Sequence, residues 1–281
     1  MNVLMSLFMG IVQGITEFLP VSSSGHLAIL HNFLNFGYED GEHLLFDVLL
    51  HLGTLFSIFV VYRVEIKEMI SDGLSYLRMR ADSNADEPVY PKPPARAFLF
   101  IIVGTLPLVF ALIFSSSIQR LFANTFFIGF ALLVTGSLLY VSSRYIKQGN
   151  KTDKTMTMAD AVLIGLAQMV AVLPGLSRSG TTIAVGLSRG LTGAFAVRFS
   201  LLLSIPAVIG ATLWALIQAF TSGVDIFARF PTYLAGFVMA AGVGFLAIQF
   251  IRRMMAKNKF GNFAYYCWGI GALTIILSFF F

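Results

Sequence analysis

Charged residues and cysteine are both scarce in this chain of 281 residues. Only 12% of the residues are Asp, Glu, Lys or Arg, about half the share found in soluble domains, so an ordinary soluble domain is excluded. The single cysteine, Cys267, lies in an apolar run and has no second cysteine for a disulfide bond or a thiolate metal site. The chain opens without a basic segment or a small-residue cleavage site, so we expect no removable signal peptide.

Hydrophobic residues instead make up 57% of the chain, and the mean hydropathy is +0.82. A membrane-spanning helix needs about 20 apolar residues. Runs of this kind predict spans at 44–62, 97–114, 125–143, 199–218, 232–251 and 263–280.

Two further apolar stretches are short and interrupted. The first, 3–34, breaks at Pro20, and the second, 159–191, breaks at the turn around Arg178. Such broken helices are typical of re-entrant hairpins, whose open backbone must be covered by protein or water. The sequence therefore predicts an all-α integral membrane protein with six transmembrane helices and two re-entrant helical hairpins, in a single membrane domain of residues 1–281.

The basic residues indicate how the chain lies across the membrane. Sixteen of the 19 Lys and Arg residues fall in the segments 63–96, 144–158, 186–198 and 252–262. Because such residues concentrate on the cytoplasmic side, we expect a solvated cytoplasmic loop at 63–96 and both termini outside the cytoplasm. The net charge of +5 then reflects orientation and contact with anionic membrane lipid, not nucleic-acid binding.

An internal repeat relates the two hairpins. At a constant offset of 155 residues, the identical pairs are Gly10/Gly165, Gln13/Gln168, Ser22/Ser177, Ser24/Ser179 and Gly25/Gly180. Each hairpin precedes three predicted spans, so the halves, about 1–145 and 156–281, form an inverted-topology repeat. Broken helices at matching positions of such repeats predict a ligand site near the membrane midplane.

The second hairpin contains an arginine within the stretch Pro174–Thr182. A guanidinium in an apolar sequence is costly unless it meets an anion or a wet cavity, and its fixed N–H donors suit phosphate oxygens. Ser177, Ser179 and Thr182 add hydroxyls around Arg178, and the following helix points its positive end at the same place. The stretch predicts a phosphate site; the alternative is a polar turn whose arginine reaches the membrane interface.

The first hairpin supplies complementary groups. Gln13 and Glu17 share a helix face and could bind Mg²⁺ or Ca²⁺ or accept a proton. Beyond the turn, Ser22 and Ser23 precede His26 by three or four residues, the spacing of a hydroxyl nucleophile beside an imidazole base. The alternative is that Ser22 only caps the helix and His26 satisfies a buried carbonyl.

Asp47 and His51, four residues apart within a predicted span, form another polar face. This spacing is equally compatible with two roles. The two residues could support the side chains that carry out the chemistry, or they could form a purely structural pair.

Two motifs resemble those of the bacterial undecaprenyl-diphosphate phosphatases, also called the bacitracin-resistance family. The stretch Gln13–His26 is similar to that family's (E/Q)xxxE motif and its serine-rich turn, and Pro174–Thr182 is similar to its PGxSRSxxT motif. Further similar stretches run from Phe46 to Thr54 and from Phe199 to Ala211, so the resemblance covers essentially the whole chain.

The resemblance implies an enzyme of the bacterial inner membrane that converts undecaprenyl diphosphate to undecaprenyl phosphate and recycles the lipid carrier for cell-wall synthesis. It also implies a divalent cation, a site open to the outer face and a homodimer. By motif position, Glu17 with Gln13 serves metal binding or proton transfer, and the catalytic centre contains the first serine-rich turn and His26. Arg178, with the hydroxyls beside it, holds the diphosphate.

The expected mechanism is attack by Ser23 on the terminal phosphorus while His26 takes the serine proton. A second interpretation remains open: a polyprenyl-phosphate flippase or anion transporter would use the same midplane site, because inverted repeats with broken helices are also transporter architecture. A carrier needs an anion site but no nucleophile.

Overall fold

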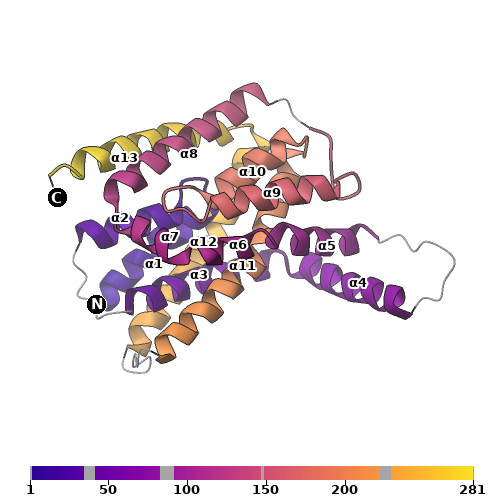
Figure 1. Ribbon diagram of the computed structural model, residues 1–281, viewed down its shortest axis with the longest axis horizontal. Coiled ribbons are helices and arrows are strands. Elements are labelled where there is room, and N and C mark those ends of the chain that lie inside the picture. The colour runs from indigo at the N-terminus through magenta and orange to yellow at the C-terminus, as the bar shows by residue number, and fades with distance from the viewer. Residues whose placement is uncertain (1, 35–41, 83–91, 147–148, 222–228, 281) are drawn as a thin grey trace.

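The computed structural model describes residues 2–34, 42–82, 92–146, 149–221 and 229–280 (Figure 1). These residues form α-helices and one short 3₁₀ helix, and no β-strand occurs among them. The helices are α1 (Val3–Phe18), α2 (Ser23–Phe33), α3 (Glu42–Val61), α4 (Arg63–Asp82), α5 (Pro93–Thr105), α6 (Leu108–Ile113), α7 (Ser115–Phe122), α8 (Thr125–Tyr145), α9 (Met158–Val170), α10 (Arg178–Ser188), α11 (Gly193–Thr221), α12 (Phe230–Ala256), η1 (Phe260–Asn262) and α13 (Phe263–Leu277).

Helix length and hydropathy suit a multi-pass membrane protein. Five stretches of the described residues are long and apolar enough to cross a membrane: Pro93–Ala111, Thr125–Tyr145, Gly193–Gln218, Phe230–Ala256 and Phe260–Leu277. A sixth candidate combines Leu45–Val61 with Arg63–Met79, which meet at a bend of 83°. The helices α1 and α9 are apolar but have only 16 and 13 residues, so each is about 24 or 20 Å long and too short to span about 30 Å of hydrocarbon.

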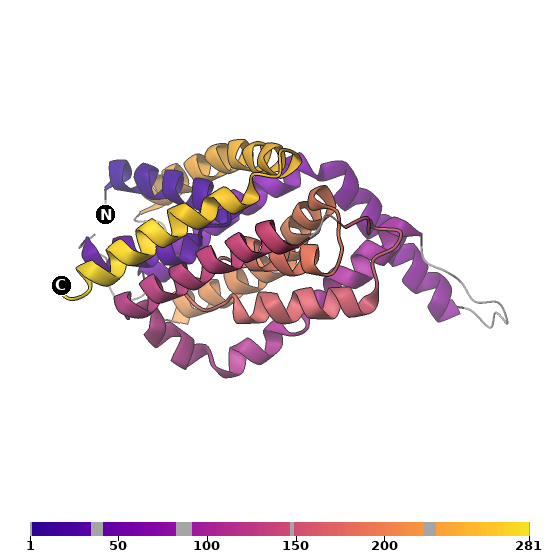
Figure 2. The ribbon, with the colours of Figure 1, turned by 90° about the horizontal axis from the view of Figure 1, so that it is seen from above.

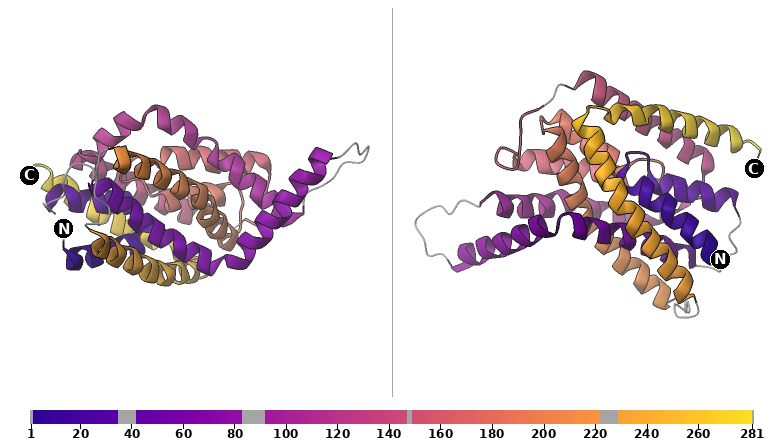
Figure 3. Two further views of the ribbon diagram at one scale, coloured as in Figure 1. Left: turned by 90° about the horizontal axis from the view of Figure 1, so that it is seen from below. Right: turned by 180° about the vertical axis from the view of Figure 1, so that it is seen from behind.

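Within the predicted cytoplasmic loop 63–96, residues Arg63–Asp82 form the helix α4. The stretch contains many strong helix formers, and its one glycine, Gly73, allows close packing: a Cβ there would lie 2.5 Å from the Phe98 ring on α5. The helices α4 and α5 run side by side and project from one side of the molecule (Figures 1 and 3). Residues 83–91 of the predicted loop lie outside the described residues.

The helices α1 and α2 form one hairpin, and α9 and α10 form a second. Each second helix has 11 residues, and the two begin at Ser23 and Arg178, which are 155 residues apart. The hairpins are held from outside, because α1 packs against α12 and α9 against α5. The remaining long helices α8 and α13 lie side by side, and both chain ends lie at the same end of the molecule (Figure 2).

The hairpin tips touch each other. A Cβ on Gly25 would lie 3.0 Å from the Cα of Gly175, and a Cβ on Gly180 would lie 3.1 Å from the Cβ of Pro20. At the offset of 155, Pro20 corresponds to Gly175, so these are the same contact made twice, once from each hairpin. The tips therefore bring the two polar motifs together beside a buried apolar core.

Asp160 fixes the far end of the second hairpin, outside the membrane-spanning stretches named above. Its buried carboxylate accepts hydrogen bonds from Lys151 Nζ at 2.8 Å, Arg189 Nε at 2.9 Å and the Thr157 backbone N–H at 3.0 Å. Burial alone would raise the pKa of Asp160, but these hydrogen bonds outweigh it and lower the pKa to about 2. The carboxylate thus joins the start of α9 to the end of α10.

Candidate active site

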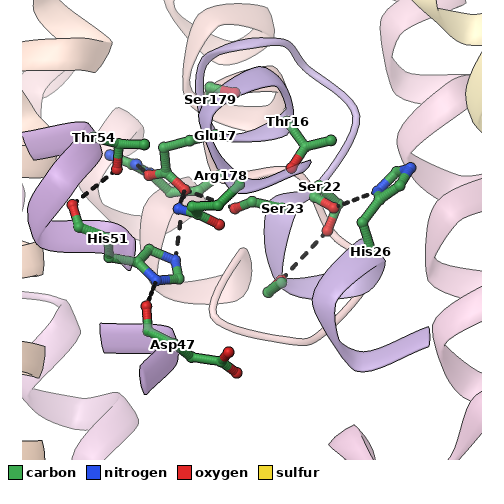
Figure 4. Close-up of polar contacts among 12 residues, drawn as sticks. Thr16, Glu17, Ser22, Ser23, His26, Asp47, His51, Thr54, Arg178 and Ser179 are labelled. Atoms are coloured by element: carbon green, nitrogen blue, oxygen red, sulfur yellow. Dashed lines mark hydrogen bonds and ion pairs between the residues drawn. The ribbon is translucent and has the colours of Figure 1, made fainter. Parts of the chain in front are cut away.

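Glu17, at the end of α1, is the centre of the polar cluster (Figure 4). One carboxylate oxygen, Oε1, is paired with Arg178 Nη2 of α10. The other, Oε2, accepts hydrogen bonds from Ser23 Oγ at 2.7 Å and from Gln13 Nε2 at 3.0 Å, and His51 Nε2 lies 3.5 Å away. The carboxylate is 6% exposed, so burial strengthens each of these interactions.

The structure therefore brings together most of the polar residues predicted in the two motifs, but in a different pairing. Ser23 contacts Glu17, not His26. The His26 Nδ1 lies 2.8 Å from the Ser22 carbonyl oxygen, and its Nε2 lies 2.9 Å from Tyr266 Oη of α13. The His26 and Tyr266 rings also stack with centroids 5.7 Å apart.

These contacts define the state of His26. A carbonyl oxygen only accepts hydrogen bonds, so Nδ1 must carry a proton, and Nε2 of the neutral ring accepts from the tyrosine hydroxyl. Both nitrogens are then occupied, and in Figure 4 the ring points away from Ser23 and Glu17. The predicted Ser23–His26 pair is not formed, and the alternative that the imidazole satisfies a carbonyl is confirmed. Sequence reasoning missed Tyr266, because 240 residues separate it from His26.

The serines before each second helix act as caps. Ser22 Oγ accepts from the Gly25 N–H at 3.2 Å, and Ser177 Oγ accepts from the Gly180 N–H at 3.0 Å. The predicted capping role of Ser22 is confirmed. Ser22 is 2% exposed and does not line the cavity, so its expected contact with substrate has no support in the geometry.

The first tip is strained where the second is not. Ser22 has φ +71°, which is unfavourable for a residue with a side chain, whereas the left-handed residue of the second tip is Gly175 with φ +90°. Pro20 stands at the position equivalent to Gly175, and its ring fixes φ near −65°. The turn therefore takes its positive φ two residues later, immediately before Ser23.

The second tip is held by its neighbours. Ser179 Oγ donates to the Leu19 carbonyl at 3.3 Å, and the backbone N–H of Ser177 donates to Thr135 Oγ1 of α8 at 3.1 Å. Thr182 lies further along α10, where its hydroxyl contacts the Arg178 carbonyl at 2.8 Å and Ser200 Oγ at 2.6 Å. Thr182 does not line the cavity, so the geometry offers no support for its predicted contact with substrate.

Asp47 and His51 lie beside the cluster, together with a histidine that sequence reasoning missed. Asp47 pairs with His31 Nε2 at 3.0 Å, and its backbone carbonyl accepts from His51 Nδ1 at 2.7 Å. His51 is thereby oriented with Nε2 toward Glu17. The His31–Asp47 pair joins α2 to α3, and no motif spacing indicates it.

A cavity of about 1120 Å³ opens onto these groups. Its polar end contains Glu17, Ser23, Arg178 and Ser179, and its other walls include apolar residues of α6, α7 and α11. The apolar wall residues include Leu108, Phe122, Val208 and Ala211. A ligand with an anionic head and an apolar body fits this combination.

The same residues include possible ligands for a divalent cation. Among the described residues, no group of three His, Cys, Asp or Glu side chains is placed to hold a metal ion. Gln13 Oε1 is, however, buried without a hydrogen-bond partner beside Glu17. One amide oxygen and one carboxylate fit Mg²⁺, which usually takes one or two protein ligands and completes its shell with phosphate oxygens and water.

Comparison with known proteins gives a consistent result. A family model described as "Bacitracin resistance protein BacA" matches residues 6–273. A protein of Methanosphaera stadtmanae named undecaprenyl-diphosphatase is 40% identical over 99% of this chain and 99% of its own length. Proteins with the same name from Desulforapulum autotrophicum and Carboxydothermus hydrogenoformans are 39% and 37% identical, each over 99% of this chain and 99% or 98% of their own lengths.

Proposed function

Because the chain belongs to the bacitracin resistance protein BacA family, we propose that it hydrolyses undecaprenyl diphosphate to undecaprenyl phosphate and inorganic phosphate. The observation that carries this proposal is the hydroxyl of Ser23 on the carboxylate of Glu17, next to Arg178, at the polar end of a cavity with apolar walls. The cavity accepts the lipid chain, and the cluster supplies both a nucleophile and an anion site.

Binding comes first in the mechanism. The diphosphate enters between the hairpin tips and takes Arg178 as its principal partner, since a guanidinium forms bidentate contacts with phosphate oxygens. Ser179 and the N-terminal end of α10 add donors on the same side. A divalent cation held by Glu17 and Gln13 would neutralise charge on the diphosphate oxygens.

Transfer then occurs at the first tip. The Ser23 oxygen attacks the terminal phosphorus, its proton passes to Glu17 Oε2, and the bond to the bridging oxygen breaks so that lipid phosphate leaves. Water then attacks the phosphoserine, the Ser23 oxygen leaves and takes back the proton from Glu17, and inorganic phosphate is released. The 2.7 Å contact supports Glu17, and not His26, as the proton acceptor.

His26 has a positioning role in this proposal. Its Nδ1–H holds the Ser22 carbonyl in the strained turn, and Tyr266 holds the ring. His51, whose Nε2 lies 3.5 Å from Glu17, keeps the carboxylate in place together with Asp47.

We also propose how the helices are arranged in the membrane. Six spans and the two hairpins form an inverted repeat of about 1–145 and 156–281, in the cytoplasmic (inner) membrane, with the cavity open to the outer face. The basic segments and the matched starts of α2 and α10 support this arrangement. A homodimer within membrane lipid is the expected assembly.

Purified protein in detergent tests the function. We expect release of inorganic phosphate from a polyprenyl diphosphate without any ion gradient, and Ser23→Ala should lose most of it. A flippase or transporter would release none, and equal release by the Ser23→Ala variant would exclude the serine mechanism.

A further inference from the structure

Gln168 of α9 is a buried amide without a partner. It is 1% exposed, and neither Nε2 nor Oε1 has a hydrogen bond within the described part of the chain. The same side chain lines the cavity, together with Ala171, Ser177 and Arg178. A buried polar group left unpaired is costly, so a ligand in this cavity is the expected source of its hydrogen bonds.

The repeat explains why this amide is unpaired. Gln168 lies 155 residues after Gln13, whose Nε2 donates to Glu17. The residue equivalent to Glu17 in the second hairpin is Val172, which offers no acceptor. The second hairpin thus keeps the donor and has lost the carboxylate that the donor serves in the first.

The same comparison assigns different tasks to the two tips. Ser23 of the first tip is equivalent to Arg178 of the second. The first hairpin therefore carries the nucleophile and the proton acceptor, and the second carries a cation and an unused amide donor. The second hairpin is suited to bind negative charge that is not attacked.

In-line displacement at phosphorus also places the two phosphates of the substrate on different sides of the site: the attacked phosphate at the first tip and the lipid-linked phosphate toward the second hairpin. The leaving oxygen must lie opposite Ser23, so the lipid-linked phosphate extends across the cavity, away from the first tip. We propose that Gln168 donates Nε2–H to an oxygen of this lipid-linked phosphate and thereby holds the leaving group in the site. The inference rests on the proposed function and names a contact on its leaving group.

Gln168→Leu separates a ligand contact from a structural one. We expect about a tenfold increase in KM for a polyprenyl diphosphate, as for loss of one hydrogen bond to a charged group, with kcat within about threefold. Inhibition by the corresponding polyprenyl monophosphate, which retains the lipid-linked phosphate, should weaken by a similar factor. Inhibition by inorganic phosphate, the product from the attacked end, should not change.

Stability gives an independent readout. The ligand-free leucine variant should have the same or a higher Tm than the wild type, because an unpaired polar group is removed. Gln249→Leu is the matched control, since Gln249 belongs to α12 and does not line this cavity. Its KM and product inhibition should equal those of the wild type. Gln168→Glu, nearly the same size, should raise KM further than leucine because it places a carboxylate against the phosphate.

Three outcomes overturn the proposal: unchanged KM in both Gln168 variants, equal effects of Gln168→Leu and Gln249→Leu, or a ligand-free Tm that falls by several degrees in Gln168→Leu. The last would mean that the amide holds a structural water. Failure of the wild type to release phosphate would instead refute the proposed function and this inference with it.

Discussion

His26 provides a direct test of how the first tip works. If its imidazole positions the turn, the required atom is Nδ1, which donates to the Ser22 carbonyl at 2.8 Å. The Nδ2 of asparagine occupies nearly the same position on the side chain, whereas the Nε2 of glutamine corresponds to the nitrogen that faces Tyr266. His26→Asn and His26→Gln therefore separate the two nitrogens.

The size of the effect follows from two hydrogen bonds. Each contributes roughly 0.5–1.5 kcal/mol, so loss of both favours relaxation of the strained Ser22 turn by about 1–3 kcal/mol, or about 5- to 150-fold in kcat. His26→Ala should fall in this range, and His26→Gln, which loses the contact that holds the Ser22 turn, should lose more activity than His26→Asn. His26→Asn and Tyr266→Phe each remove only the hydrogen bond between His26 and Tyr266, so each should lose about two- to tenfold.

The assay is phosphate release from a polyprenyl diphosphate in detergent, with kcat and KM determined for each variant and folding checked by size-exclusion chromatography. Asparagine has no group that can act as a base near pH 7. If His26→Asn is folded and as inactive as His26→Ala, the imidazole is itself a proton acceptor and the positioning role is refuted. Combining Tyr266→Phe with His26→Asn should cost nothing beyond the asparagine variant, because the tyrosine acts through the ring.

Three further predictions follow from the other contacts. Arg178→Ala should lower kcat/KM by about 100-fold or more, since it removes a charge-assisted phosphate contact, and Arg178→Lys should recover only part of it; near-normal turnover of the alanine variant would exclude the phosphate role. In a Cys267→Ala background, a cysteine at Arg120 of α7 should react with an impermeant thiol reagent applied to spheroplasts and one at Lys257 after α12 should not, and the reverse pattern would overturn the proposed orientation. Stability in detergent should fall as the pH drops from about 4 to 2, because the Asp160 carboxylate, with its pKa lowered to about 2, contributes about 2 kcal/mol above its unfolded pKa that is lost as it is protonated. Asp160→Asn should be less stable at pH 7 and should show a smaller decrease over this range; the same decrease would assign the pH effect to other groups.

Much of the fold can be predicted from local patterns in the sequence. The apolar runs predict α8, α11, α12 and α13 to within a few residues, except that α11 and α12 are longer than expected. The interrupted stretches predict the pairs of short helices, since Pro20 cannot continue a helix. Arg63–Asp82 forms α4 although it is rich in charged residues, because charge does not prevent helix formation.

The sequence predicts which residues form the site better than it predicts which of them contact each other. Spacing along one helix places Ser23 and His26 near each other, but rotation around the helix directs their side chains to different partners. Those partners, Glu17 before the turn and Tyr266 in the last helix, are set by tertiary packing. The His31–Asp47 contact likewise depends on how α2 meets α3, which no local pattern encodes.

The ion pair between Glu17 and Arg178 provides an internal competitor for anions. Any phosphate that takes the guanidinium must displace a carboxylate that is already attached to the protein and therefore present at high effective concentration. A small anion has only its charge to offset this exchange, whereas a lipid diphosphate also gains from burial of its chain in the cavity. In the proposed mechanism, the carboxylate returns to Arg178 once the lipid product has left and favours expulsion of inorganic phosphate, so the pair that delays binding of stray anions should also speed turnover.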